Sequence, residues 1–214
     1  MPDNAVTKRR GRPPAIGRED IIRAALSLLG PQRSVATLTL REVARAAGIA
    51  PNSFYRHFPD IDALAVCLIE RAGSTLRRII GDARRSLERP DSVVRMSMEI
   101  FIEQLDADDG FLPLLLREGH VGSDAFKQAV EAQLCHFEDE LQQDLLRLSA
   151  AHGFVVDHPA LAARAITRLV FVMGTQALDQ PPAQRRQLVE QSVVMLRMII
   201  DGAQRPQTQA AALP

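Results

Sequence analysis

Residues 48–60 of the chain, GIAPNSFYRHFPD, bring together aromatic, basic and hydrogen-bonding side chains directly after a glycine. They include Tyr55, the only tyrosine of a chain that has no tryptophan. Asn and Arg side chains can read base edges, and hydroxyl and backbone N–H groups can hold phosphates. The segment therefore suits a nucleic-acid contact, although its composition would also suit the core of a small helical unit or a catalytic cluster.

The remaining candidate catalytic and metal-binding residues have spacings that do not suit catalysis or metal binding. Cys135 and His136 are adjacent, so on a helix their side chains project about 100° apart, a poor geometry for a nucleophile and its base. The string DADDG resembles the start of a calcium loop, but Gly110 and Arg117 occupy positions where acidic ligands are needed. No HExxH, CxxC, GxSxG or P-loop string occurs. We expect no enzyme, no metal site and no cofactor.

Charge is distributed unevenly along the chain. Residues 1–60 contain ten Lys and Arg against five Asp and Glu, a net charge of +5, and because the whole chain is neutral the remainder carries −5. This asymmetry favours a basic module that binds a polyanion, although a charge cluster can also be a solvated face. Residues 1–17 are predicted to be a flexible basic arm, which could lie in a groove of DNA or simply be a solvated tail.

The composition is that of a soluble globular protein, with 214 residues, 46% hydrophobic and 24% charged. No run of about 18 apolar residues predicts a membrane span, and the basic N-terminus lacks the apolar segment of a secretory signal. The two cysteines are too few for a disulfide framework. We expect a cytoplasmic protein that does not enter a membrane.

Apolar residues recur at helical spacing along most of the chain, and no strand-like alternation persists. Helices are predicted at about 18–29, 40–47, 51–58, 61–89, 91–105, 111–120, 123–151, 159–178 and 182–202. The sequence thus predicts an all-α fold of about nine helices. We expect a helix-turn-helix DNA-binding domain at 18–62, a ligand-binding and dimerisation domain at 63–203, and a disordered tail at 204–214.

The helix-turn-helix prediction rests on local signals. Thr39 is followed three residues later by Glu42, the spacing of a capping box, Gly48 supplies a turn, and Pro51 suits the first turn of a second helix. The apolar residues Val43, Ala44, Ala47, Ile49, Phe54 and Phe58 are assigned to the core. The outward residues predicted to bind DNA are Thr39, Arg41, Arg45, Ala50, Pro51, Asn52, Ser53, Tyr55, Arg56 and His57, with Lys8, Arg9, Arg10 and Arg12 of the arm.

The string TLTLREVARAAGIAPNSFYRHFPDIDAL resembles the TetR family of bacterial transcriptional repressors. The strings LLLREGHVGSDAFKQAVEAQLCHF and ALDQPPAQRRQLVEQSVVMLRMIIDGA are similar to its FabR and DesT branch, which regulates unsaturated fatty-acid synthesis and acyl-CoA desaturation. The resemblance covers about residues 18–203. It implies a homodimer on a double-stranded DNA operator, with long-chain acyl-CoA or acyl-ACP as the regulatory ligand. Many members have a Lys before the fourth helix, where this chain has Ile61, as is typical of the FabR-like branch.

The ligand pocket would be formed by residues 91–178, since thioethers and rings there adapt to a flexible apolar chain. The same residues at helical spacing equally suit an ordinary core. Arg117, after an apolar run, could meet a phosphate or thioester carbonyl or form an intramolecular ion pair, and Arg185 and Arg186 could meet a nucleotide or face water. The candidate ligand-binding residues are Met98, Phe101, Leu105, Phe111, Leu115, Arg117, Phe126, Leu134, Phe137, Phe171 and Met173.

Together with the residue patterns, the resemblance implies a ligand-responsive repressor of genes of fatty-acid desaturation or unsaturated fatty-acid synthesis. Two of its helices, at about 159–178 and 182–202, would pack against their symmetry mates, and the operator would be a pseudopalindrome. A repressor of an efflux operon that responds to a drug-like hydrophobic ligand is one alternative. An acyl-binding carrier protein is the alternative from another class.

Overall fold

A computed structural model describes residues 16–29, 33–85, 90–107 and 110–206. Within these ranges the chain forms nine α-helices, so the all-α prediction is confirmed. The helices are α1 (Arg18–Leu29), α2 (Leu40–Ala46), α3 (Pro51–Phe54), α4 (Ile61–Arg85), α5 (Pro90–Glu103), α6 (Phe111–Val121), α7 (Asp124–His152), α8 (Pro159–Ala177) and α9 (Pro182–Ala203), with a short 3-10 helix η1 (Val35–Thr37) between α1 and α2.

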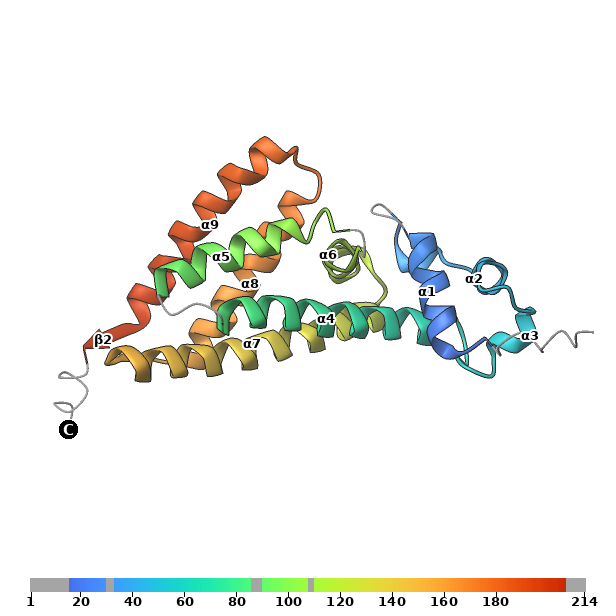
Figure 1. Cartoon of the computed structure of the whole chain (residues 1–214), viewed down its shortest axis with the longest axis horizontal. Helices are drawn as coiled ribbons and strands as arrows, with labels where there is room; N and C mark the ends of the chain where they lie inside the picture. The colour runs from blue at the N-terminus through green and yellow to red at the C-terminus, as the bar shows by residue number, and fades with distance from the viewer. Residues whose placement is uncertain (1–15, 30–32, 86–89, 108–109, 207–214) are drawn as a thin grey trace, which may run out of the picture.

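The first three helices form a small unit at one end of the molecule (Figure 1). The Thr39 side chain and Glu42 make the predicted capping box at the start of α2. Gly48 has φ of 69°, a left-handed conformation that glycine adopts without steric cost, and it turns the chain from α2 towards α3. Phe54 is completely buried and Phe58 is 2% exposed, as expected for the anchors of a helix-turn-helix unit.

The larger unit is built around α4 and α7, which run side by side along the molecule, while α5, α8 and α9 lie over them (Figure 1). A glycine allows the close approach of the two long helices, because a Cβ atom at Gly73 would lie 2.4 Å from Oε1 of Gln133. In Figure 1, α6 is seen end-on between this bundle and the N-terminal unit. No helix in the described ranges is long and apolar enough to cross a membrane.

One continuous hydrophobic cluster joins the two units. It runs from Ile21 and Phe54 in the N-terminal unit, through Leu64, Leu68 and Leu76 of α4, into the helical bundle. Since α4 contributes to the packing of both units, the N-terminal unit and the bundle share one core.

One local prediction needs correction, because α3 is only four residues long, with turns following it. The described part of α4 ends at Arg85, and residues 86–89, which the sequence also assigned to this helix, lie outside the described residues. The structure also contains an antiparallel strand pair, β1 (Phe154–Val156) with β2 (Gln204–Pro206). Residues 204–206 of the expected disordered tail are therefore hydrogen-bonded, whereas 207–214 lie outside the described residues. A three-residue strand shows no alternation, and its partner lies some fifty residues away.

Candidate nucleic-acid interface and ligand cavity

The residues predicted to bind DNA gather on the outside of α2, α3 and the turns that follow. Tyr55 is 58% exposed and meets the buried Phe54 ring edge-on, with 6.1 Å between the ring centroids. Ser53 and His57 are half-buried, so they are less accessible to a DNA partner than their exposed neighbours. The exposed members of the predicted set are Thr39, Arg41, Arg45, Ala50, Pro51, Asn52, Tyr55 and Arg56, whereas Lys8, Arg9, Arg10 and Arg12 lie outside the described residues.

The short α3 is continued by hydrogen-bonded turns, which keep Tyr55, Arg56 and His57 in a fixed arrangement. The N–H of Arg56 donates to the carbonyl oxygen of Ser53 at 3.3 Å, and the N–H of His57 donates to that of Phe54 at 2.9 Å. Tyr55, Arg56 and His57 lie between the buried Phe54 and Phe58 in the chain. The burial of these two rings therefore determines the direction in which the polar side chains point.

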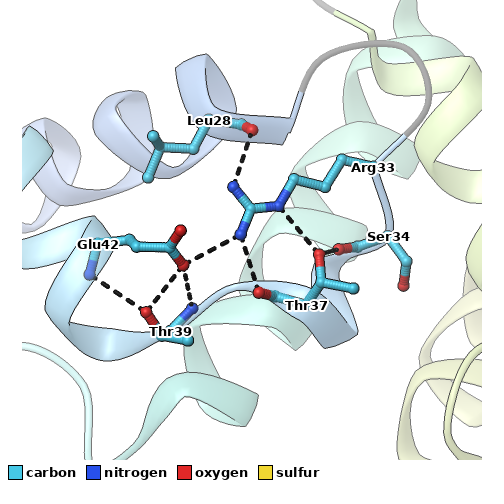
Figure 2. Close-up of polar contacts among 6 residues, drawn as sticks. All are labelled: Leu28, Arg33, Ser34, Thr37, Thr39 and Glu42. Atoms are coloured by element: carbon cyan, nitrogen blue, oxygen red, sulfur yellow. Dashed lines mark hydrogen bonds and ion pairs between the residues drawn. The ribbon is translucent and has the colours of Figure 1, made fainter.

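Arg33 holds the N-terminal unit together, a role that the sequence analysis missed (Figure 2). Its guanidinium donates from Nε to Oγ1 of Thr37 at 2.9 Å and from Nη2 to the Thr37 carbonyl at 2.9 Å. Nη2 also donates to Oε2 of Glu42 at 3.0 Å, and Nη1 approaches the carbonyl oxygen of Leu28 at 3.5 Å. One side chain therefore connects the end of α1, η1 and the start of α2.

The capping box of α2 is part of the same network (Figure 2). Oγ1 of Thr39 accepts from the N–H of Glu42 at 3.3 Å and donates to Oε2 of Glu42 at 2.8 Å. Hydrogen bonds from Thr39 and then from Arg33 hold the pKa of Glu42 below its ordinary value. The donor of the Thr39 hydroxyl is already used, so any phosphate at this position would meet a preorganised cap rather than a free side chain.

The start of α4 carries no basic side chain for DNA, because Ile61 is its first residue and is half-buried. The nearby cation Arg18 instead supports the aromatic anchor. Its guanidinium carbon lies 4.7 Å from the centroid of the Phe58 ring, and Nη2 lies 3.2 Å from Sγ of Cys67. Cation–π contacts of this kind contribute about 0.5–1 kcal/mol at exposed sites.

Comparison with known proteins agrees with this geometry. Residues 21–66 match the family model described as bacterial regulatory proteins, tetR family. The match runs from α1 into the start of α4, so the N-terminal unit is similar to the domain by which TetR-family transcriptional regulators bind DNA.

Solved structures of similar fold extend over most of the chain. The fatty acid degradation regulator FadR from Bacillus halodurans is 16% identical, with a TM-score of 0.66 over 84% of this chain and 93% of that one. A TetR-family regulator from Rhodococcus sp. is 17% identical, with a TM-score of 0.68 over 86% and 97%. Reduced NemR from E. coli is 19% identical, with a TM-score of 0.67 over 86% and 97%. At these identities the similarity demonstrates the common fold.

The helical bundle contains a cavity of about 660 Å³, within the usual range of small-molecule sites. Its wall is formed by α4 to α9 together with Phe154 and Gln204. On α7 the wall extends from Val130 to His152. At 1.5 Å per residue, those 22 steps correspond to roughly 33 Å, so the cavity is long and narrow.

The structure divides the predicted ligand-binding residues into two groups. Six line this cavity: Met98, Phe101, Leu115, Leu134, Phe137 and Phe171. Five do not: Leu105, Phe111, Phe126 and Met173 are buried in the surrounding core, and Arg117 is half-buried away from the wall. Helical periodicity identifies an inward face, but it does not distinguish a residue beside a void from one beside another side chain.

The arginines considered as partners of a nucleotide occupy other positions. Arg185 donates from Nε to the carbonyl oxygen of Ala177 at 3.0 Å and pairs with the carboxylate of Asp106 at 2.7 Å. It thus ties the start of α9 to the end of α8, while Arg186 is exposed. Among the residues that the structure describes, no group of three His, Cys, Asp or Glu side chains is arranged to hold a metal ion.

The cavity wall also contains charged residues that the sequence analysis did not single out. Arg84 is 7% exposed, and its Nε donates to Oδ2 of the buried Asp144 at 2.6 Å. A signal was available in the sequence, because Arg84 continues the apolar i, i+4 stripe of Leu76 and Ile80. A charge on such a stripe is rarely buried unless it is paired.

A buried acidic residue connects the bundle with the N-terminal unit. Glu118 of α6 is completely buried, and its Oε1 accepts a hydrogen bond of 3.0 Å from the N–H of Val35, which is 2% exposed. One turn and two turns before Glu118, Leu115 and Leu112 line the cavity. One helix therefore contacts both the cavity and the segment that leads into α2.

Proposed function

We propose that this chain is a TetR-family regulator and that it represses genes of fatty-acid desaturation or unsaturated fatty-acid synthesis in response to long-chain acyl-CoA or acyl-ACP. The observation that carries the proposal is the long apolar cavity, whose α6 wall also holds the DNA-binding unit through Glu118 and Val35. Only a ligand with different affinities for two arrangements of the dimer can switch such a protein.

The polar surface of the N-terminal unit supports DNA as the partner. Arg41, Arg45, Asn52 and Arg56 are exposed on one short unit, and the Arg33 network holds its helices in a fixed arrangement. In a helix-turn-helix protein, the second helix lies in the major groove and dimers address half-sites roughly 34–36 Å apart or more. We infer a pseudopalindromic operator.

Exposed apolar side chains support a dimer through α8 and α9. Leu161 and Val172 of α8 are 63% and 53% exposed, and Val194 and Met198 of α9 are 53% and 69% exposed. Large apolar side chains with such exposure commonly mark interaction surfaces when they gather on adjacent elements. Packing α8 and α9 against their symmetry mates would bury them in a four-helix interface.

The chemistry of the cavity supports a flexible apolar ligand. Side chains such as Met98, Phe101 and Phe137 can adapt to an alkyl chain, and each methylene that leaves water contributes about 0.8 kcal/mol. The FabR and DesT resemblance indicates an acyl thioester, and one regulator of the same fold is described as acting in fatty acid degradation.

The DNA-binding assignment is tested by a gel-shift titration of a duplex from a desaturase or fatty-acid promoter. The Tyr55→Ala/Arg56→Ala double variant should bind at least tenfold more weakly, since single contacts to bases are worth about 1–3 kcal/mol. Arg23→Ala, on the exposed side of α1, is the matched control and should bind normally. A double variant that binds the duplex like the wild type would refute the assignment of Tyr55 and Arg56 to DNA binding.

The ligand is tested by mass spectrometry of lipid that co-purifies with the protein, followed by the same shift with added palmitoyl-CoA or oleoyl-CoA. The proposal predicts that long-chain acyl-CoA changes the DNA affinity. A shift that ignores acyl-CoA and responds to a cationic dye such as rhodamine 6G would indicate an efflux-type repressor. Lipid binding with no specific DNA binding would indicate a carrier protein.

A further inference from the structure

The cavity wall carries polar atoms that the protein itself does not satisfy. Nη2 of Arg84 and Oγ of Ser97 are buried and find no hydrogen-bond partner among the described residues. Both residues line the cavity, Arg84 from α4 and Ser97 from α5. An unsatisfied buried donor is costly, so such atoms on a cavity wall indicate where a ligand supplies the missing acceptor.

The chemistry of Arg84 restricts what the ligand can present. A guanidinium has donors only, so its partner must be an acceptor, and a cationic group is disfavoured. Its charge is already balanced by Asp144 at 2.6 Å, and Oε2 of Glu140 lies 3.9 Å from Nη2. A further carboxylate would meet two like charges, whereas an uncharged carbonyl oxygen would gain the hydrogen bond without that repulsion.

Ser97 differs from other serines in the helices of this protein. Ser27, Ser149 and Ser192 each donate to a backbone carbonyl of the preceding turn, at distances of 2.8, 2.8 and 2.7 Å. Helical serines commonly satisfy their hydroxyl groups in this way. The Ser97 hydroxyl is buried without such a bond, and it therefore remains a donor on the wall of the cavity.

The position of Arg84 also indicates how a ligand would be oriented along the cavity. Its partner Asp144 and the apolar Val130 both lie on the α7 wall, 14 residues apart, which is roughly 21 Å along a helix. An extended backbone advances roughly 1.2 Å per bonded atom. A chain of about 16 carbons would therefore run from Arg84 to the α6 end of the cavity.

We propose that Arg84 and Ser97 form the polar subsite of the cavity and bind the uncharged carbonyl oxygen of a long-chain acyl conjugate. The alkyl chain then extends towards Leu112 and Leu115 of α6. The inference rests on the proposed acyl ligand and adds which residues recognise it, which end of the cavity holds the carbonyl group, and why a free fatty acid is disfavoured.

The experiment compares two probes that differ only at the carbonyl group, using calorimetric titration of the full chain. Palmitoyl-CoA has a thioester carbonyl, and S-hexadecyl-CoA has a methylene group in its place. The wild type should bind palmitoyl-CoA tenfold or more tightly than S-hexadecyl-CoA, because a hydrogen bond to a charged donor is lost with the thioether. Palmitate should bind more weakly than palmitoyl-CoA.

Variants then assign the difference to the two side chains. Arg84→Lys keeps a cation opposite Asp144 but removes the guanidinium fork, and Ser97→Ala removes only the hydroxyl group. Both should weaken binding of palmitoyl-CoA and leave S-hexadecyl-CoA nearly unchanged. Ser74→Ala is the control, because the Ser74 hydroxyl donates to its own helix and the residue is exposed. Thermal unfolding verifies that each variant is folded.

The outcomes separate this inference from the proposed function. Equal wild-type affinities for the two CoA probes would overturn the carbonyl subsite while leaving acyl-CoA as the ligand. Tighter binding of palmitate than of palmitoyl-CoA would contradict the preference for an uncharged acceptor. No binding of any of the three probes would refute the acyl ligand itself, and the subsite with it.

Discussion

The buried hydrogen bond between Glu118 and Val35 provides the most direct test of how the cavity is connected to the DNA-binding unit. It joins residues 83 positions apart, and both partners are almost completely excluded from water. Replacing Glu118 with Leu introduces an apolar side chain of similar size and leaves the Val35 N–H without an acceptor. Glu118→Gln retains a carbonyl oxygen at nearly the same place.

The size of the effect follows from the type of bond. Leaving a buried donor such as the Val35 N–H without an acceptor costs about 1–3 kcal/mol. Opening of the segment around Val35 should therefore become easier by about 1–3 kcal/mol in Glu118→Leu. This corresponds to an amide exchange rate roughly 5–150 times faster at Val35. Glu118→Gln should show a smaller increase.

Hydrogen exchange followed by NMR measures this local opening separately from the global stability. His120→Leu is the matched control, since His120 is exposed two residues further along the same helix. Its Val35 amide should exchange at the wild-type rate. If Val35 exchanged equally slowly in Glu118→Leu and in the wild type, the hydrogen bond would not hold the N-terminal unit to α6.

The same variant tests the functional connection. Allosteric coupling typically amounts to about 1–3 kcal/mol, a 5–150-fold change in affinity. In Glu118→Leu, the ratio of DNA dissociation constants with and without palmitoyl-CoA should move towards one, while palmitoyl-CoA binding itself persists. An unchanged ratio would mean that the signal reaches the DNA-binding unit by another route, such as α4.

Three further predictions concern assembly, pH and salt. Met198→Glu places a charge on the exposed α9 face and should convert a dimer into a monomer in analytical ultracentrifugation; a dimer that persists contradicts the proposed interface. Because hydrogen bonds from Thr39 and then Arg33 lower the pKa of Glu42, its stabilising contribution is complete above about pH 4.5 and is lost as the pH falls through the lower folded-state pKa. Glu42→Gln should therefore flatten the melting temperature between pH 5 and 3, and an unaltered slope would count against the network. For six to ten phosphate contacts, DNA affinity should fall about 10³–10⁵-fold between 50 and 200 mM salt, and a salt-independent affinity would exclude the phosphate contacts.

Much of the DNA-binding unit was predictable because its signals are local. A capping box requires two side chains three residues apart, and Thr39 and Glu42 satisfy it within one turn of helix. Gly48 has the left-handed conformation that a turn between helices requires. The burial of Phe54 and Phe58 follows from their spacing along one helical face.

The helical bundle around the cavity was predicted less well, because its features depend on residues far apart in the sequence. The pairs Arg84–Asp144 and Val35–Glu118 span 60 and 83 residues. Nothing in the local pattern of either partner identifies the other, although a charge on an apolar stripe indicates that a partner is required.

The sequence by itself determined which residues face inwards and that the N-terminal unit presents a polar, basic surface, because helical periodicity and caps depend on neighbours within one or two turns. Only the tertiary structure decided which inward side chains border the cavity. A void exists where helices from different parts of the chain fail to fill the space between them, so it belongs to their packing and to none of the helices alone. The same holds for β1 and β2, since a strand of three residues exists only through its distant partner.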